Sequence, residues 1–177
     1  MAEPTKSAIE MVGTALEMEE KGKSFYAKAL SKCDNVFGKD MFSKLKSDED
    51  VHIERIKEIY KSLTEGKGWT DIWKNRDVDD TGLTSIFRKL AKNHGKKIDM
   101  STDDIDALKV GMDFEQKSVE FYEKQLEIAQ DDLEKEFARK MIEEERGHYS
   151  ALADMKFYID NPEAWFEEKG RSLLDGA

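Results

Sequence analysis

The sequence predicts an all-α protein, a bundle of four long helices, and three observations support this prediction. Apolar residues recur at spacings of three and four along four long segments, and the alternation that is typical of strands is absent. Only two prolines occur, Pro4 and Pro162, one near each end of the 177-residue chain, so nothing between them forbids long helices. The second pair of segments also repeats the first. This length suits one domain with a single core, which we expect to span residues 1–177.

The first helical hairpin is expected at about residues 6–65. Its first helix follows Thr5, and one face of that helix carries Ile9, Val12, Leu16, Glu19, Tyr26 and Leu30. The second helix runs from about Val36 to Thr64 and stops before Gly66. Its core face carries Met41, Leu45, Ile53, Ile56, Tyr60 and Leu63. Glu49 and His52 fall on this same face, although a buried ionised carboxylate is costly unless something compensates its charge.

A crossover at about residues 66–100 joins the two hairpins. Within it, the stretch TSIFRKLAKNHGKK is expected to form a short helix that ends at Gly95. A connection of this length can run along the whole bundle, so that the third helix starts again from the other end.

The second hairpin is expected at about residues 101–160. Its first helix starts after Ser101, where the sequence STDD offers an N-cap and an acidic N3 residue, and its core face carries Ile105, Leu108, Met112, Glu115, Val119, Tyr122 and Leu126. The next helix, at about residues 132–160, carries Leu133, Phe137, Met141, Glu145, His148, Leu152, Met155 and Ile159. The tail, residues 161–177, is expected to add a short helical turn opened by Pro162, with Trp165 and Phe166 packed on the body.

The two hairpins are copies of one another at a constant offset of 96 residues. In the first helix of each hairpin, Glu19, Lys21, Phe25, Tyr26, Lys28 and Leu30 match Glu115, Lys117, Phe121, Tyr122, Lys124 and Leu126. In the second helix, Lys44, Glu49 and His52 match Lys140, Glu145 and His148. Nine identities without a gap indicate a duplicated helical hairpin.

Helix geometry predicts that six polar side chains meet at one level of the bundle. The two glutamates of each hairpin are 30 residues apart, and polar turn residues lie at the midpoint of each interval. Because a helix rises by about 1.5 Å per residue, fifteen residues up and fifteen back return the chain to the same height. Each histidine lies three residues beyond its glutamate, on the same face. The converging residues are Glu19, Glu49, His52, Glu115, Glu145 and His148.

Four carboxylates this close together would repel one another and stay largely protonated unless cations lay between them. Two divalent or trivalent metal ions remove this difficulty. Carboxylate and imidazole ligands suit iron or manganese, with zinc as a competitor, and do not suit copper(I) or an iron–sulfur cluster.

The only cysteine, Cys33, excludes an intrachain disulfide and a CxxC pair, and we interpret it as a packed apolar side chain.

The residues resemble a known family. One Glu from each of two helices, plus Glu-x-x-His from each of the other two, is the arrangement of ferritin-like carboxylate proteins. The resemblance is closest to the rubrerythrin branch, through EMEEKGKSFY and DFEQKSVEFY, each a Glu with a Tyr seven residues on, and through SDEDVHIERI and EEERGHYSAL. It implies a ferritin-like four-helix bundle and a non-haem di-iron oxidoreductase, a peroxidase of oxidative stress that reduces hydrogen peroxide or dioxygen.

The resemblance also implies a role for each residue. Glu19 and His52 would serve one metal ion, Glu115 and His148 would serve the other, and Glu49 and Glu145 would bridge the two. Asp48 and Glu144, each directly before its motif, would hold the remaining N–H of a histidine. Tyr26 and Tyr122 would donate hydrogen bonds to ligand carboxylates, although packing in the core explains both tyrosines equally well.

Two departures from the rubrerythrin pattern affect the expected mechanism. Rubrerythrins typically carry an extra glutamate three residues after the third-helix ligand, where this chain has Ser118. This makes a redox-linked movement of the metal doubtful. They also typically append a rubredoxin-type domain with four cysteines, which this sequence does not contain. Electrons are therefore expected to come from a separate donor protein, such as a rubredoxin.

The composition limits the partners and the location. The net charge of −10 and the pI near 4.9 exclude nucleic acid and anionic lipid as expected partners. No segment has the apolar length of a membrane span, and MAEPTKS lacks a secretory apolar region, so we expect a cytoplasmic protein. A homodimer or higher homo-oligomer is expected, in which one site can be built from hairpins of one chain or of two.

Two other functions remain open at this point. The site could oxidise Fe(II) for storage in a hollow oligomer, as a ferroxidase does, although the matching of the two halves favours the rubrerythrin type. It could also hold zinc or manganese without turnover, in a structural or regulatory bundle, because the same ligands suit those ions.

Overall fold

The computed structural model describes residues 6–79, 81–93, 98 and 100–175, and the all-α prediction is confirmed. The four long helices are α1 (Lys6–Lys32), α2 (Val36–Thr64), α4 (Thr102–Ile128) and α5 (Asp132–Asp160). The crossover contains the 3₁₀ turn η1 (Ile72–Asn75) and the helix α3 (Thr81–Lys92). The tail consists of α6 (Pro162–Trp165), a π-helical turn η2 (Phe166–Gly170) and α7 (Arg171–Asp175). The described residues contain no strand.

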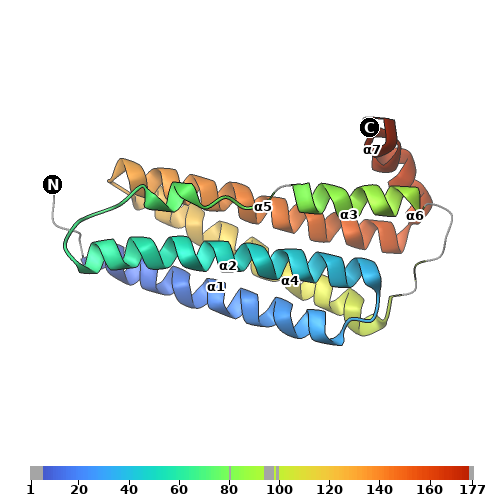
Figure 1. Ribbon diagram of the computed structural model, residues 1–177, viewed down its shortest axis with the longest axis horizontal. Coiled ribbons are helices and arrows are strands. Elements are labelled where there is room, and N and C mark those ends of the chain that lie inside the picture. The colour runs from blue at the N-terminus through green and yellow to red at the C-terminus, as the bar shows by residue number, and fades with distance from the viewer. Residues whose placement is uncertain (1–5, 80, 94–97, 99, 176–177) are drawn as a thin grey trace.

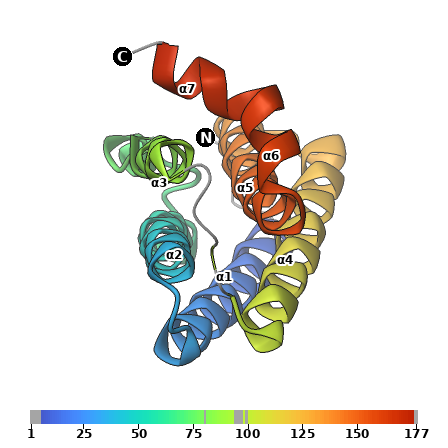
Figure 2. The ribbon, with the colours of Figure 1, turned by 90° about the vertical axis from the view of Figure 1, so that its right-hand side faces the viewer.

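The long helices form a four-helix bundle with a long connection between its halves. Helices α1 and α2 pack as one antiparallel hairpin, α4 and α5 as another, and the hairpins meet through α1 against α4 and α2 against α5 (Figures 1 and 2). The crossover runs back along the bundle from the end of α2 to the start of α4 at the opposite end (Figure 1), as the sequence predicts. Helix α3 packs on α2 and also contacts the tail (Figure 2).

Capping side chains define where the helices begin. The Asn35 side chain accepts hydrogen bonds from the backbone N–H groups of residues 37 and 38 at the start of α2. Ser101 and Asp104 form the expected capping box of α4, and Asp131 caps α5 in the same way as Asn35 caps α2. At the end of α2, Gly66 adopts a φ of 73°, a conformation that residues with a Cβ rarely adopt.

The structure differs from the sequence predictions in three details. Helix α3 begins at Thr81, earlier than the predicted segment, and its expected end at Gly95 lies outside the described residues. The tail continues beyond the predicted turn to residue 175, and Trp165 is buried against Phe87 and Tyr158. The prediction that Tyr60 faces the core is wrong, because it is 39% exposed. Ile59 is fully buried instead and lies between Ile56 and Leu63, which are both buried as predicted.

The apolar core is divided into two clusters, with a polar layer between them. One cluster contains Leu45 of α2 and Leu152 of α5, and the other contains Ile56 of α2 and Met141 of α5. The Glu-x-x-His motif of each helix lies between its two apolar residues along the sequence. The layer is therefore closed by hydrocarbon on both sides along the bundle axis. None of the helices in the described part of the chain combines the length and apolar character needed to cross a bilayer.

Candidate metal centre

Six carboxylate and imidazole side chains converge in this polar layer. Helices α1 and α4 each supply one glutamate, and α2 and α5 each supply a glutamate and a histidine three residues later. Each of the six residues is at most 3% exposed: Glu19, Glu49, His52, Glu115, Glu145 and His148. The structure thus brings together all the residues in which the sequence predicts metal ligands.

Their oxygen and nitrogen atoms form two groups of the size that a metal ion requires. In one group, potential ligand atoms of Glu19, Glu49 and His52 all lie within 4.8 Å of one another. In the other, the same holds for Glu49, Glu115, Glu145 and His148. Glu49 belongs to both groups, as a bridging carboxylate must. Glu145 belongs to the second, and its Oε1 also lies 3.1 Å from Nδ1 of His52 in the first.

Each histidine is held at its outer nitrogen by a carboxylate of the other hairpin. Nε2 of His52 lies 3.1 Å from Oε2 of Glu144, and Nε2 of His148 lies 3.1 Å from Oδ2 of Asp48. A carboxylate at Nε2 favours the tautomer that keeps its proton there, so the lone pair of Nδ1 is free for a metal ion. Both Nδ1 atoms face the glutamates of the layer, and the two rings are stacked with centroids 5.6 Å apart.

The two buried tyrosines hold the outer glutamates in the same crosswise manner. The hydroxyl group of Tyr122 on α4 donates a hydrogen bond of 2.6 Å to Oε1 of Glu19 on α1. The hydroxyl group of Tyr26 on α1 donates to Oε1 of Glu115 on α4. Burial raises the pKa of both tyrosines well above its ordinary value, and the neighbouring carboxylates raise it further. Both hydroxyl groups therefore remain protonated donors.

An additional buried residue, which sequence reasoning missed, supports the His52 side of the layer. The guanidinium group of Arg55 is 1% exposed and binds both carboxylate oxygens of Glu144, while its Nε donates to the carbonyl oxygen of Arg76 in the crossover. Burial by itself raises the pKa of Glu144, but the hydrogen bonds and charges of His52 and Arg55 lower this pKa to about 2. The sequence could have indicated this role, because Arg55 lies three residues after His52 and therefore on the core face of α2.

Without a metal ion, the layer balances its charge with protons. Burial raises the pKa of Glu49 well above its ordinary value, and burial and the charge of Glu145 raise that of Glu115 to about 8. Burial by itself lowers the pKa of His52 and of His148, but the carboxylates around them raise both well above the ordinary value. Metal binding would replace protons on these groups, because both imidazole and carboxylate must be deprotonated to act as ligands.

Unpaired buried atoms show that the layer fits metal ions. Among the described residues, none donates a hydrogen bond to either oxygen of Glu145 or to Oε2 of Glu49. Nδ1 of His148 also has no hydrogen-bond partner among them. Buried polar atoms without partners are costly, so they are rare in folded proteins. These four atoms belong to residues of the two groups above, and cations would satisfy them.

Small residues flank the layer on α1 and α4. Gly22 and Ser118 occupy matched positions of the repeat, three residues after Glu19 and Glu115, and both are buried. A Cβ atom at Gly22 would lie 3.2 Å from Oε1 of Glu49, so any side chain there would press on that carboxylate. Ser118 is 6% exposed at the position where rubrerythrins typically carry the extra glutamate.

Comparison with known proteins identifies one family. A family model described as rubrerythrin matches residues 10–156, which cover most of both hairpins and include all six converging residues. Searches of curated proteins and of solved structures found no match to the chain.

Proposed function

Because this chain belongs to the rubrerythrin family, we propose that it is a non-haem di-iron oxidoreductase that reduces hydrogen peroxide, or dioxygen, at the buried layer. The observation that supports this most strongly is the pair of overlapping carboxylate and imidazole groups with unpaired buried atoms. Such ligands suit iron, and manganese or zinc are the competing ions.

In this proposal, each hairpin supplies ligands to both ions. Glu19 and His52 would hold one ion, Glu115 and His148 would hold the other, and Glu49 and Glu145 would serve both. When bound, two ferrous ions supply the two electrons that cleave the O–O bond of peroxide, so that one peroxide and two protons give two waters and the irons become ferric.

The chain's own residues prepare the layer for this chemistry. The four glutamates offset the positive charge, which grows by two units when both irons are oxidised. Asp48 and Glu144 keep a proton on Nε2 of the histidines, and the tyrosine hydroxyl groups orient Glu19 and Glu115. The two apolar clusters exclude bulk water along the bundle axis, which strengthens the electrostatic interactions inside.

The electrons come from a separate protein in this proposal, such as a rubredoxin, and the chain acts as a homodimer or higher homo-oligomer. A donor site outside these 177 residues is supported by their single cysteine, which cannot form a four-cysteine iron site. A reduced rubredoxin should be oxidised by peroxide in the presence of the iron-loaded protein, and not in the presence of the metal-free protein.

The test is anaerobic loading with Fe(II), followed by one equivalent of hydrogen peroxide. We expect two irons per chain and a rise in near-ultraviolet absorption that saturates at one peroxide per two irons. Glu145→Gln removes a carboxylate between the two ions and should reduce both the bound iron and the absorption change. Glu143→Gln is the matched control, because it makes the same change on an exposed position of the same helix. Two bound irons without a spectral change would contradict the proposal.

Two further measurements address the competing functions. A mineral core requires a hollow assembly, so an oligomer no larger than a tetramer in size-exclusion chromatography would argue against iron storage. Metal analysis of protein purified without added metal should find iron, whereas zinc or manganese at two per chain would favour a bundle without turnover.

A further inference from the structure

The two halves of the metal centre have unequal surroundings, although their ligands match. Asp48 and Glu144 occupy equivalent positions of the repeat, and each holds a histidine at Nε2. Each also pairs with a lysine four residues earlier, Lys44 for Asp48 and Lys140 for Glu144. The equivalence stops there, because the residues on either side of the two histidines differ.

On the His52 side, a buried arginine lies beside the carboxylate that holds the histidine. Arg55 fills the space beside Glu144, binds both of its oxygens and is tied to the crossover through the carbonyl oxygen of Arg76. The residue before His52 is Val51, a branched side chain. Separating Arg55 from Glu144 would leave an uncompensated buried charge, so we expect the two side chains to stay paired.

On the His148 side, the equivalent residues are small. Gly147 stands where the first hairpin has Val51, and Ala151 stands where it has Arg55. A Cβ atom at Gly147 would have nothing within 4 Å. A cavity of about 260 Å³ lies here, and Asp48, Gly147 and His148 are among the residues that line it. Glu144, the carboxylate that holds His52, also lines it. His52 does not line this cavity.

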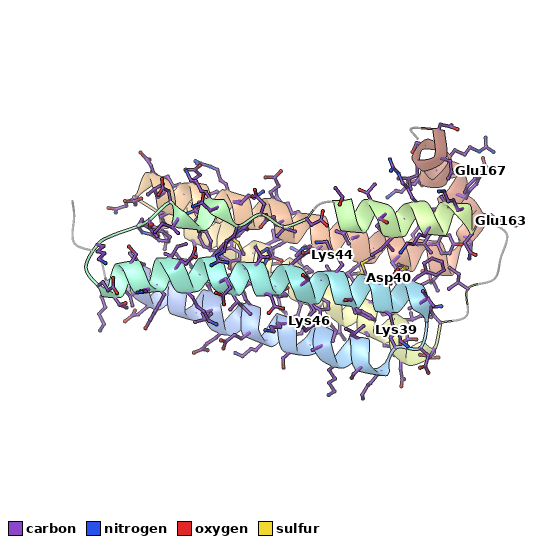
Figure 3. All side chains as sticks on the ribbon, viewed as in Figure 1. Lys39, Asp40, Lys44, Lys46, Glu163 and Glu167 are labelled. Carbon is purple, nitrogen blue, oxygen red and sulfur yellow. The ribbon has the colours of Figure 1, made fainter. Side chains whose placement is uncertain are left out.

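The crossover forms the outer wall of this cavity. Val78 and Leu83 line it, together with Lys44 of α2. Lys44 lies against the first turn of α3, because a Cβ atom at Gly82 would lie 2.6 Å from its Cε. Figure 3 labels Lys44 on the stretch of α2 that lies beside α3. The crossover therefore holds Arg55 in place beside Glu144 and forms part of the wall of the cavity that His148 lines.

We propose that the two metal positions exchange at different rates: Arg55 retains the ion held by His52, and the ion held by His148 leaves and enters through the cavity beside Gly147. This inference rests on the dinuclear site proposed above. Arg55 acts through Glu144 and His52 and is therefore a positioning residue. The unequal halves allow one position to be refilled while the other keeps its ion.

The test measures the release of iron from protein loaded anaerobically with Fe(II), after mixing with excess ferrozine. For the unmodified protein, we expect two phases of equal amplitude whose rates differ at least about tenfold. Arg55 supports only one of the two histidines, and the loss of such an outer-shell partner typically changes metal affinity by about 10–100-fold. Arg55→Met should accelerate the slow phase by a similar factor and leave the fast phase unchanged. Gly147→Leu, which fills the cavity, should slow the fast phase alone.

Two further variants separate positioning from loss of structure. Arg55→Lys keeps a cation beside Glu144 and should restore most of the slow phase. Arg76→Ala is the matched control, because Arg55 binds the backbone carbonyl of residue 76, and the side chain of Arg76 pairs with Glu58 instead. This control should leave both phases unchanged.

The outcomes distinguish this inference from the proposed function. Fewer than two irons per chain would overturn the dinuclear site and the inference with it. Two irons released in one phase would overturn the inference alone, as would an Arg55→Met variant that accelerates both phases equally or a Gly147→Leu variant with an unchanged fast phase. If Arg55→Met does not fold, the two phases of the unmodified protein, Arg55→Lys and Gly147→Leu decide the question.

Discussion

His52 and Glu144 belong to different hairpins, and Nε2 of the histidine lies 3.1 Å from Oε2 of the carboxylate. The equivalent pair, His148 and Asp48, crosses between the hairpins in the opposite direction. Both tyrosine–glutamate hydrogen bonds cross as well. Each hairpin thus orients the carboxylates and imidazoles that the other supplies, so the polar layer is a product of their association.

The crosswise hydrogen bonds of the tyrosines predict a specific loss of metal affinity. Tyr122→Phe removes the donor to Glu19 and leaves the ring in place, so iron should bind about tenfold more weakly in competition with a chelator. Tyr26→Phe should have a similar effect through Glu115. Tyr60→Phe, on the exposed face of α2, is the control. Equal affinities of the Tyr122→Phe and Tyr60→Phe variants would show that the hydroxyl group does not hold the carboxylate.

Two helical glycines should respond to alanine in opposite directions. Gly147→Ala adds a Cβ atom in open space on α5 and should raise the free energy of unfolding by about 0.5–1 kcal/mol, because alanine loses less backbone entropy in a helix. Gly38→Ala would place its Cβ atom 2.6 Å from Sγ of Cys33 and should lower that free energy by about 1–3 kcal/mol. Urea denaturation of the metal-free variants measures both. A stabilised Gly38→Ala variant would contradict the close packing at Cys33.

The capping box of α4 should contribute measurably to stability. Ser101→Ala removes the acceptor for the backbone N–H of Asp104 and should lower the free energy of unfolding by about 1 kcal/mol. Ser101→Asn provides another good N-cap side chain and should retain most of the stability. Thermal unfolding of the two variants side by side measures the difference. If both lose the same amount, the capping hydrogen bond is not the cause.

The single cysteine predicts a change of stability at alkaline pH. Burial raises the pKa of the Cys33 thiol from 9.0 to about 11. Between these values the unfolded chain loses the thiol proton while the folded chain keeps it, so the contribution of Cys33 is present below about pH 9 and declines as the pH rises toward about 11.

The difference between the unmodified protein and Cys33→Ala isolates this contribution, because lysines and other groups that titrate there are common to both. The advantage of the unmodified protein in urea denaturation should shrink from about pH 8 to about pH 10.5. An advantage that is constant over this interval would mean that the thiol ionises as readily in the folded chain as in the unfolded one.

The sequence predicted the helices of the bundle with little error. The bounds of α2 and α5 follow from apolar periodicity and from polar turn residues, which act locally along the chain. The error at Tyr60 has a physical cause. Residues 59 and 60 both follow Ile56 at helical spacing, and the rotation of α2 against its neighbours decides which of them is buried.

The level of the six converging side chains was also predictable from the sequence. Equal spacings of 30 residues and a fixed helical rise place them at one height, and the 96-residue repeat doubles the motif. Their roles as metal ligands stay a prediction that iron binding will test.

The sequence by itself therefore determined the helices, their pairing into two similar hairpins and the height of the polar layer, because these depend on local spacing and on helical rise. Only the tertiary structure decided which carboxylate holds which histidine, that Arg55 reaches Glu144 and the crossover, and that a cavity is lined by His148 and not by His52. Those contacts depend on how two hairpins face each other and on the path of the crossover over α2 and α5. Neither is encoded in the spacing of residues along a single helix.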